Sequence, residues 1–190
     1  MSSPVKEITQ EVVDNLNKTI VVLDTETTGF SKYYDRVIEF GAIKLTGGKV
    51  VDTFTSLINP EIPIPYKSTQ VHGITDSMVE NAPTEKEISS QIVDFLSGSC
   101  YIVGHNVNFD IGFLEEMFKR NGYYLNCMYI DTLKFARQYF KNVHSHKLVD
   151  LAEYLNIEVV TAHRALADVE TTIMLLRHIA YQAVKNKQDY

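Results

Sequence analysis

The sequence has 190 residues, a formal net charge of −6 and two cysteines. This length suits one well-buried domain, and no uninterrupted apolar stretch approaches the roughly 18 residues that a membrane-spanning helix needs. The first residues lack the apolar segment of a secretory signal peptide, so we expect a cytoplasmic protein with no membrane partner. The wide spacing of Cys100 and Cys127 predicts neither a disulfide framework nor a cysteine-based zinc site.

The acidic balance argues against a protein that coats duplex nucleic acid, because such proteins present a basic surface to the phosphates. It is compatible with an enzyme that binds only a few nucleotides. Divalent cations held by four carboxylates would offset part of the negative charge, and the local potential at a site matters more than the total.

The first part of the chain predicts a short helix or arm followed by an antiparallel meander. Apolar residues at helical spacing mark residues 5–17 as the helix. Strands are expected over 19–24, 36–45 and 49–58, with Thr46-Gly47-Gly48 as the hairpin turn between the last two. Three prolines within 59–65 indicate a surface loop, which leads to a short helical stretch at 66–70.

Helices and strands alternate in the rest of the chain. Thr84 and Glu87 form a capping box for a helix that ends near Gly98, and Asn108 is expected to be the N-cap of a helix that stops at Asn121-Gly122. Further strands are predicted over 101–104 and 128–130, and further helices over 132–140, 147–155 and 164–184. A meander followed by alternation predicts an α/β fold with a mixed sheet covered by helices. We expect an arm at 1–17, one domain at 18–184 and a polar tail at 185–190.

The strongest chemical signal is Asp24-Thr25-Glu26, at the end of the apolar run Ile20-Val21-Val22-Leu23. Carboxylates two residues apart on a strand share one face. Two such charges repel and raise each other's pKa, so a site that keeps both ionised is expected to hold a divalent metal ion.

Asp110 and Asp168 are each predicted in the first turns of a helix, where the helix dipole alone favours an acid. Asp110 follows a buried strand, and ligands bind at the carboxyl ends of such strands in α/β sheets. His163 lies five residues before Asp168, a rotation of about 140° on one helix, so it must precede the helix to act with Asp168. Alone, such a histidine is more often a surface or capping residue.

In order, Asp24-x-Glu26, Asp110 and His163-x4-Asp168 resemble the DEDDh exonuclease superfamily, in particular the proofreading exonucleases of bacterial DNA polymerase III. The resemblance extends from about residue 18 to 179. It includes the flanking residues Val21 to Gly29, Gly104 to Asp110 and His163 to Asp168, the substrate-side loop Val71 to Thr75, and the late helix around Ser145 to Leu148 with Leu151-Ala152. It implies a ribonuclease H-like fold: a five-stranded mixed sheet, with its first three strands antiparallel, flanked by helices.

The resemblance also implies two metal ions and a role for each acid. Asp24 would bridge both ions, Glu26 and Asp168 would complete the site of the water-activating ion, and Asp110 would support the second. His163 would accept the proton of the attacking water, which suits its near-neutral pKa. A shell of oxygen ligands favours Mg²⁺ or Mn²⁺ over zinc.

On the substrate side, the backbone around Thr27, Thr28 and Gly29 is expected to lie against the last nucleotide, although Gly29 is equally explained as a turn residue. His72 either contacts the terminal nucleotide, as the resemblance implies, or stabilises its loop. Four other histidines are expected to pack or to lie on the surface rather than bind metal: His105, His144, His146 and His178.

The predicted function is therefore a metal-dependent 3′–5′ DNA exonuclease that releases 5′ nucleoside monophosphates. It would prefer a single-stranded or frayed 3′ end and proofread for a replicative DNA polymerase. One alternative is an RNA-trimming or oligoribonucleotide-degrading enzyme of the same fold, and another is a non-catalytic nucleic-acid-binding module. The sequence leaves open whether the chain is a free-standing nuclease or one domain of a larger polymerase.

Overall fold

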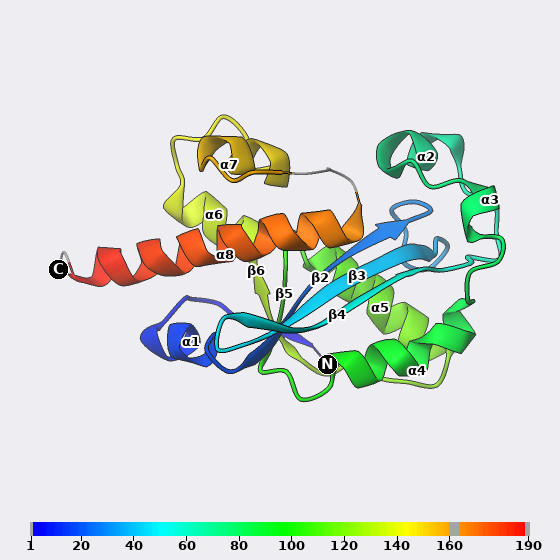
Figure 1. The fold of residues 1–190 in the computed structure, drawn as a ribbon, viewed down its shortest axis with the longest axis horizontal. Helices are drawn as coiled ribbons and strands as arrows, with labels where there is room; N and C mark the ends of the chain where they lie inside the picture. The colour runs from blue at the N-terminus through cyan, green and yellow to red at the C-terminus, as the bar shows by residue number, and fades with distance from the viewer. Residues whose placement is uncertain (1, 160–163, 189–190) are drawn as a thin grey trace.

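A mixed β-sheet runs through the centre of the molecule (Figure 1). The structure, a computed structural model, describes residues 2–159 and 164–188. Its strands are β1 (Ser3–Pro4), β2 (Thr19–Thr27), β3 (Val37–Thr46), β4 (Lys49–Leu57), β5 (Tyr101–Gly104) and β6 (Met128–Asp131). They lie in the order β1-β6-β5-β2-β3-β4. β2, β3 and β4 form the expected antiparallel meander, and β5 and β6 add to β2 in parallel.

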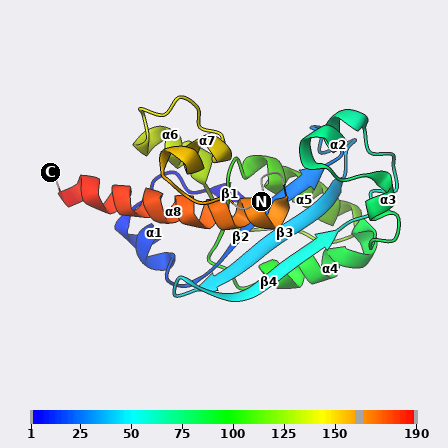
Figure 2. The same cartoon turned by 45° about the horizontal axis from the view of Figure 1, so that its top comes forward.

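Helices cover both faces of this sheet (Figures 1 and 2). They are α1 (Gln10–Asn15), α2 (Tyr66–His72), α3 (Asp76–Val79), α4 (Glu85–Leu96), α5 (Asn108–Arg120), α6 (Thr132–Tyr139), α7 (Leu148–Tyr154) and α8 (Ala165–Gln188). One core cluster joins α1, α6, α7 and α8 to one face, and a second joins α4 and α5 to the other. Within the described residues, no helix combines the length and apolar character needed to cross a bilayer.

β2 is buried on both faces, which explains its continuous apolar run. Val22 belongs to the core cluster beneath α8, whereas Val21 and Leu23 belong to the cluster beneath α4 and α5. This alternation follows from the two-residue period of a strand. The run ends where the first acid appears, so Asp24 and Glu26 lie at the end of a central strand of the sheet.

The N-terminal arm differs from the expected helix. Residues Ser3–Pro4 form β1, which pairs in parallel with β6 and gives the sheet a sixth strand beyond the five expected. α1 begins only at Gln10, because Thr9 caps it: the Thr9 hydroxyl oxygen accepts a hydrogen bond from the Val12 N–H at 3.2 Å. Val5, Ile8 and Val12 are buried in the α8-side core. The division of the chain at residues 17 and 184 stays a prediction.

Two cap predictions have opposite outcomes. The capping box of Thr84 and Glu87 is present at the start of α4. The prediction that Asn108 is an N-cap is wrong, because Val107 occupies that position and Asn108 is the first residue of α5. The Asn108 side chain instead donates to Asp131 Oδ2 at 3.1 Å and accepts a hydrogen bond from the Tyr129 hydroxyl at 2.5 Å. Its amide therefore fastens the start of α5 to β6.

Candidate active site

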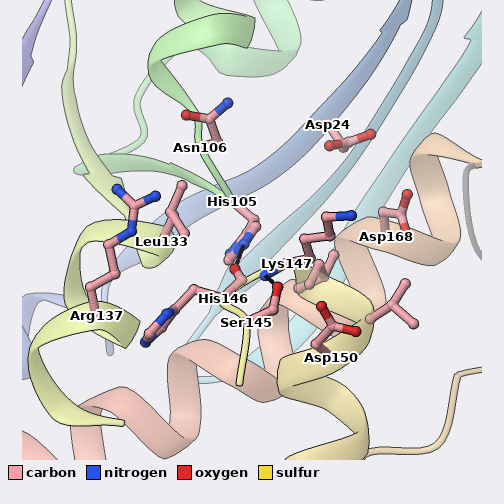
Figure 3. Close-up of a pocket in the computed structure, with 12 residues that line it drawn as sticks. Asp24, His105, Asn106, Leu133, Arg137, Ser145, His146, Lys147, Asp150 and Asp168 are labelled. Carbon is pink, nitrogen blue, oxygen red and sulfur yellow. Dashed lines mark hydrogen bonds between the residues drawn. The ribbon is translucent and has the colours of Figure 1, made fainter. Parts of the chain in front are cut away.

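Three carboxylates converge beside the end of β2. Asp24 and Glu26 come from β2, and Asp168 comes from the first turn of α8. One oxygen from each of the three lies within 4.8 Å of the other two. Asp24 and Asp168 border the same cavity in Figure 3. The structure thus brings together the acid pair and the last acid predicted from the sequence.

Gly41 allows this convergence. It pairs with Asp24 across the β2–β3 ladder, and the start of α8 crosses directly over it. A Cβ atom at position 41 would lie 2.7 Å from the backbone nitrogen of Leu166, closer than packed atoms can approach. The absence of a side chain therefore brings the first turn of α8, and Asp168 with it, close to Asp24.

An ion pair between a buried glutamate and an exposed arginine holds the same helix terminus. Glu39, which pairs with Glu26 across the ladder, is only 3% exposed. Arg164 donates to its carboxylate through Nη2 at 2.7 Å and through Nε at 3.1 Å, and the Ala165 backbone N–H donates at 3.2 Å. These bonds attach the start of α8 to β3. The sequence reasoning missed both residues, although a charged Glu39 inside the apolar run Val37 to Leu45 was a signal.

Asp110 supports the site from the opposite face of the sheet. Its Oδ1 accepts hydrogen bonds from the backbone N–H of Thr25 at 2.9 Å and from the Thr25 hydroxyl at 2.6 Å. Thr25 lies between the two acids of β2, so α5 is bonded to the centre of that motif. Asp110 is not in the group of three converging carboxylates, but its charge reaches Asp24.

The acids are held in an environment that disfavours their charge. Burial raises the pKa of Asp24 well above its usual range, and the charges of Asp110 and Glu26 raise it further. Burial, followed by the charge of Asp168, raises the pKa of Glu26 to about 8. Burial also raises the pKa of Asp110 to about 7, against the hydrogen bonds from Thr25 that lower it. A divalent cation would reverse this balance, because it stabilises the ionised carboxylates.

The predicted substrate-side residues continue from β2 into a well-bonded loop. The Thr27 hydroxyl donates to the Gly29 carbonyl at 2.6 Å, and the Thr28 hydroxyl donates to Asp35 Oδ1 at 3.1 Å. The Asp35 carboxylate fills the space beside Gly29, 2.5 Å from where a Cβ atom would lie. The Thr28 carbonyl accepts a hydrogen bond from the Ser68 hydroxyl at 2.7 Å, which ties α2 to this loop.

His72 is buried at the end of α2. Its Nδ1 accepts a hydrogen bond from the Ile74 N–H at 3.0 Å, so the ring stabilises its loop, and a contact to the terminal nucleotide stays a prediction. Its Nε2 is buried next to the Thr27 backbone and forms no well-aligned hydrogen bond with the described residues. Burial lowers the pKa of the ring, so it is neutral at physiological pH. His163 lies outside the described residues, and its role stays a prediction.

Two of the histidines expected to pack do bond within the fold. The ring of His105 is 3.0 Å from the Thr132 hydroxyl and 2.9 Å from the His146 carbonyl oxygen. The His146 ring lies 3.0 Å from the Phe140 carbonyl oxygen. These contacts link the end of β5 to the segment between α6 and α7, and they form one wall of the cavity in Figure 3.

Oxygen-rich sites of this kind are typical of phosphoryl-transfer enzymes that use divalent metal ions. Comparison with known proteins makes the class specific. The family model named RNase_T, described as an exonuclease, matches residues 21–176, so the chain belongs to this exonuclease family. The match confirms the family and the class of enzyme, an exonuclease, that the sequence predicts.

The chain is similar to bacterial polymerases and to solved exonucleases. The DNA polymerase III PolC-type of Caldanaerobacter subterraneus subsp. tengcongensis is 37% identical over 165 residues, which cover 87% of this chain and 12% of that protein. Exonuclease X in complex with 5′ overhanging duplex DNA has a TM-score of 0.67 and 26% identity, covering 85% of this chain and 91% of that chain.

Exonuclease I of E. coli in complex with a dT13 oligonucleotide has a TM-score of 0.80 and 23% identity, over 90% of this chain and 43% of that chain. Together with the sheet order, this similarity confirms the ribonuclease H-like fold.

Proposed function

We propose that this chain is a metal-dependent 3′–5′ exonuclease that removes nucleotides from the 3′ end of DNA as 5′ monophosphates. Its role would be proofreading during DNA replication. The observation that carries the proposal is the convergence of the Asp24, Glu26 and Asp168 oxygens within 4.8 Å in a member of the exonuclease family. The similarity to PolC-type DNA polymerases III and to an exonuclease bound to DNA supports DNA and replication.

The residues at the site fit the expected metal ions. The donors are carboxylate oxygens, which Mg²⁺ and Mn²⁺ prefer, and burial together with the charges of the neighbouring acids raises the pKa values of Asp24 and Glu26. Asp24, Glu26 and Asp168 would hold one ion, and Asp24 with Asp110 would hold the second. When bound, two such ions activate water and stabilise charge on the reacting phosphate and the leaving 3′ oxygen.

The chain's own residues would orient the substrate and move the proton. His163 would accept the proton of the attacking water as a general base. The backbone of Thr27, Thr28 and Gly29, with His72, would hold the terminal nucleotide. Placing a 3′ end among the converging acids requires it to leave its duplex, and unpairing costs least for a mismatched end. A mismatched terminus is therefore the better substrate, which is the physical basis of proofreading.

Proofreading also requires a replicative DNA polymerase as partner, either in the same polypeptide or as a separate chain. The similarity to a PolC-type DNA polymerase III, of which the chain spans 12%, supports a replicative polymerase as the partner. Affinity purification of the full-length gene product, followed by a polymerase assay on the eluted material, tests this assignment. Exonuclease that elutes without polymerase activity would overturn it.

The reaction is tested with 5′-labelled oligonucleotides that carry a paired or a mismatched 3′ end. We expect Mg²⁺-dependent shortening from the 3′ end, faster on the mismatched end and abolished by EDTA and by Asp24→Asn. Asp52→Asn, which removes an exposed charge on β4, is the matched control and should retain activity. If an RNA oligonucleotide of the same sequence is degraded faster than the DNA, the substrate is RNA rather than DNA. Binding in EDTA without cleavage in Mg²⁺ would show a non-catalytic module instead.

A further inference from the structure

A cavity of about 680 Å³ extends from the acid site toward α6 and α7. Asp24 and Asp168 form one end of it, and Arg137 of α6 and Lys147, which precedes α7, lie along its other walls (Figure 3). Its volume is within the range of about 300–1,000 Å³ found for sites that take up ligands. The proposed contacts to the terminal nucleotide, Thr27 to Gly29 and His72, do not line it.

The cavity carries two cations, Arg137 and Lys147. Both side chains are exposed. Within residues 2–159 and 164–188, neither forms an ion pair with an acid, Asp150 of the cavity wall included. Arg120 and Arg164 are different, because each is paired with a buried glutamate. Figure 3 shows the Lys147 side chain directed toward the space between Asp24 and Asp168. In a chain of net charge −6, these cations are available to an anionic ligand.

The position of the cavity indicates which anionic ligand it would bind. α2, which carries His72, and α7 lie on opposite sides of the start of α8 in both views (Figures 1 and 2). A nucleic-acid strand whose last nucleotide lies on the α2 side, and whose terminal phosphodiester lies at the acids, must continue on the other side. The cavity beside Asp24 and Asp168 opens there.

We propose that this cavity binds the sugar–phosphate backbone of the single strand on the 5′ side of the bond being cut, through Arg137 and Lys147. The inference rests on the proposed function, because it needs a strand that runs through the acid site. Phosphate contacts from lysine and arginine are independent of base sequence and depend on salt. The hydrogen bonds of His105 to Thr132 and to the His146 carbonyl fix the wall between α6 and α7, so the two cations are presented by a preformed surface.

The test is equilibrium binding of a 5′-fluorescein oligothymidylate in Ca²⁺, read by fluorescence anisotropy at several salt concentrations. The proteins are the wild type, the double variant Arg137→Gln/Lys147→Gln and the control Lys141→Gln. Lys141 is an exposed lysine of the same segment that does not line the cavity. The double variant should bind about tenfold more weakly, and the slope of log K against log[salt] should fall by about 0.7 for each phosphate that the variant no longer binds. Displacement by thymidine 5′-monophosphate is measured in parallel.

Retained affinity for the mononucleotide, with weaker binding of the oligonucleotide, supports the proposal and excludes the released product as the ligand of this cavity. Equal loss for both ligands would overturn it, since the cations would then contact the terminal nucleotide. An equal effect of Lys141→Gln would also overturn it, because net charge alone would explain the result. A wild-type protein that cleaves no oligonucleotide would refute the proposed function. The contribution of Arg137 and Lys147 to oligonucleotide binding is measured without cleavage, so the two proposals can fail separately.

Discussion

Acidic side chains occur in two settings in this molecule, and the two settings treat their charge differently. Where helices are fastened, each buried glutamate has an arginine: Glu39 pairs with Arg164 at 2.7 Å, and Glu85 pairs with Arg120 at 2.9 Å. At the end of β2, three carboxylates converge, and burial and mutual repulsion raise the pKa values of Asp24 and Glu26. The first arrangement pairs each glutamate with a cation of the protein, whereas the second brings like charges together, as a site for a cation from outside the protein does. In this protein, the acids paired with arginine fasten helices, whereas the acids that converge on one another form the candidate metal site.

The largest expected effect comes from removing the central acid of the converging group. Asp24→Asn should lower the rate of nucleotide release by about a thousandfold or more, since both proposed metal sites lose a ligand. The thermal midpoint in EDTA should not fall, because the substitution relieves repulsion. Oligonucleotide shortening and thermal unfolding measure the two quantities. An active variant, or one that loses activity only because it unfolds, would contradict this account.

The paired acid should behave in the opposite way. Glu39→Gln removes the buried carboxylate of an ion pair whose arginine can still reach water, so we expect a loss of about 2 kcal/mol in the free energy of unfolding and a thermal midpoint about 4–8 °C lower. Activity should fall as well, because the start of α8 loses its attachment to β3.

Glu85→Gln is the matched control for this substitution. It breaks the other pair, between α4 and α5, and should lower stability by a similar amount while activity per folded molecule is retained. Equal activity losses in the two variants would show that the Glu39–Arg164 pair has no particular connection to the site.

The converging acids should also give the metal-free protein an unusual dependence on pH. Glu26 has a pKa of about 8 in the folded protein against 4.5 for an ordinary glutamate, so between these values the folded state binds more protons than the unfolded state. Stability therefore falls as pH rises from about 5 to 8, by about 10 °C in thermal midpoint. Mg²⁺ should raise the midpoint more at pH 8 than at pH 5. Midpoints measured in EDTA and in MgCl₂ check this, and an unaltered slope in Glu26→Gln would exclude Glu26 as its source.

The smallest effect is expected at Thr25, whose hydroxyl donates to Asp110. Thr25→Val keeps the shape and the backbone donor but removes one hydrogen bond to a buried carboxylate, at a cost of about 1 kcal/mol. The pKa of Asp110 should rise, so the acid limb of the pH–rate profile should move to higher pH. Thr53→Val on β4 is the control. An unchanged profile would show that Asp110 titrates outside the pH range of activity.

The sequence predicted those parts of the site that rest on neighbouring residues. The strand that ends in Asp24-Thr25-Glu26 and the capping box at Thr84 follow from local period and local hydrogen bonding. The Glu39–Arg164 contact joins residues 125 positions apart, and no local pattern reports such a pair. Asn108 was wrongly predicted as a cap for a related reason, because its side chain bonds to Asp131 and Tyr129 on a distant strand.

The pairing of β1 with β6 has a consequence for the order in which the protein can be completed during synthesis. The Ser3 N–H bonds to the Cys127 carbonyl at 2.9 Å, and the Val5 N–H bonds to the Tyr129 carbonyl at 2.8 Å. The segment that forms β1 therefore waits for a strand made more than a hundred residues later. Until then the N-terminal segment has no partner in the sheet, so the chain closes this edge only after β2 to β5 have been made.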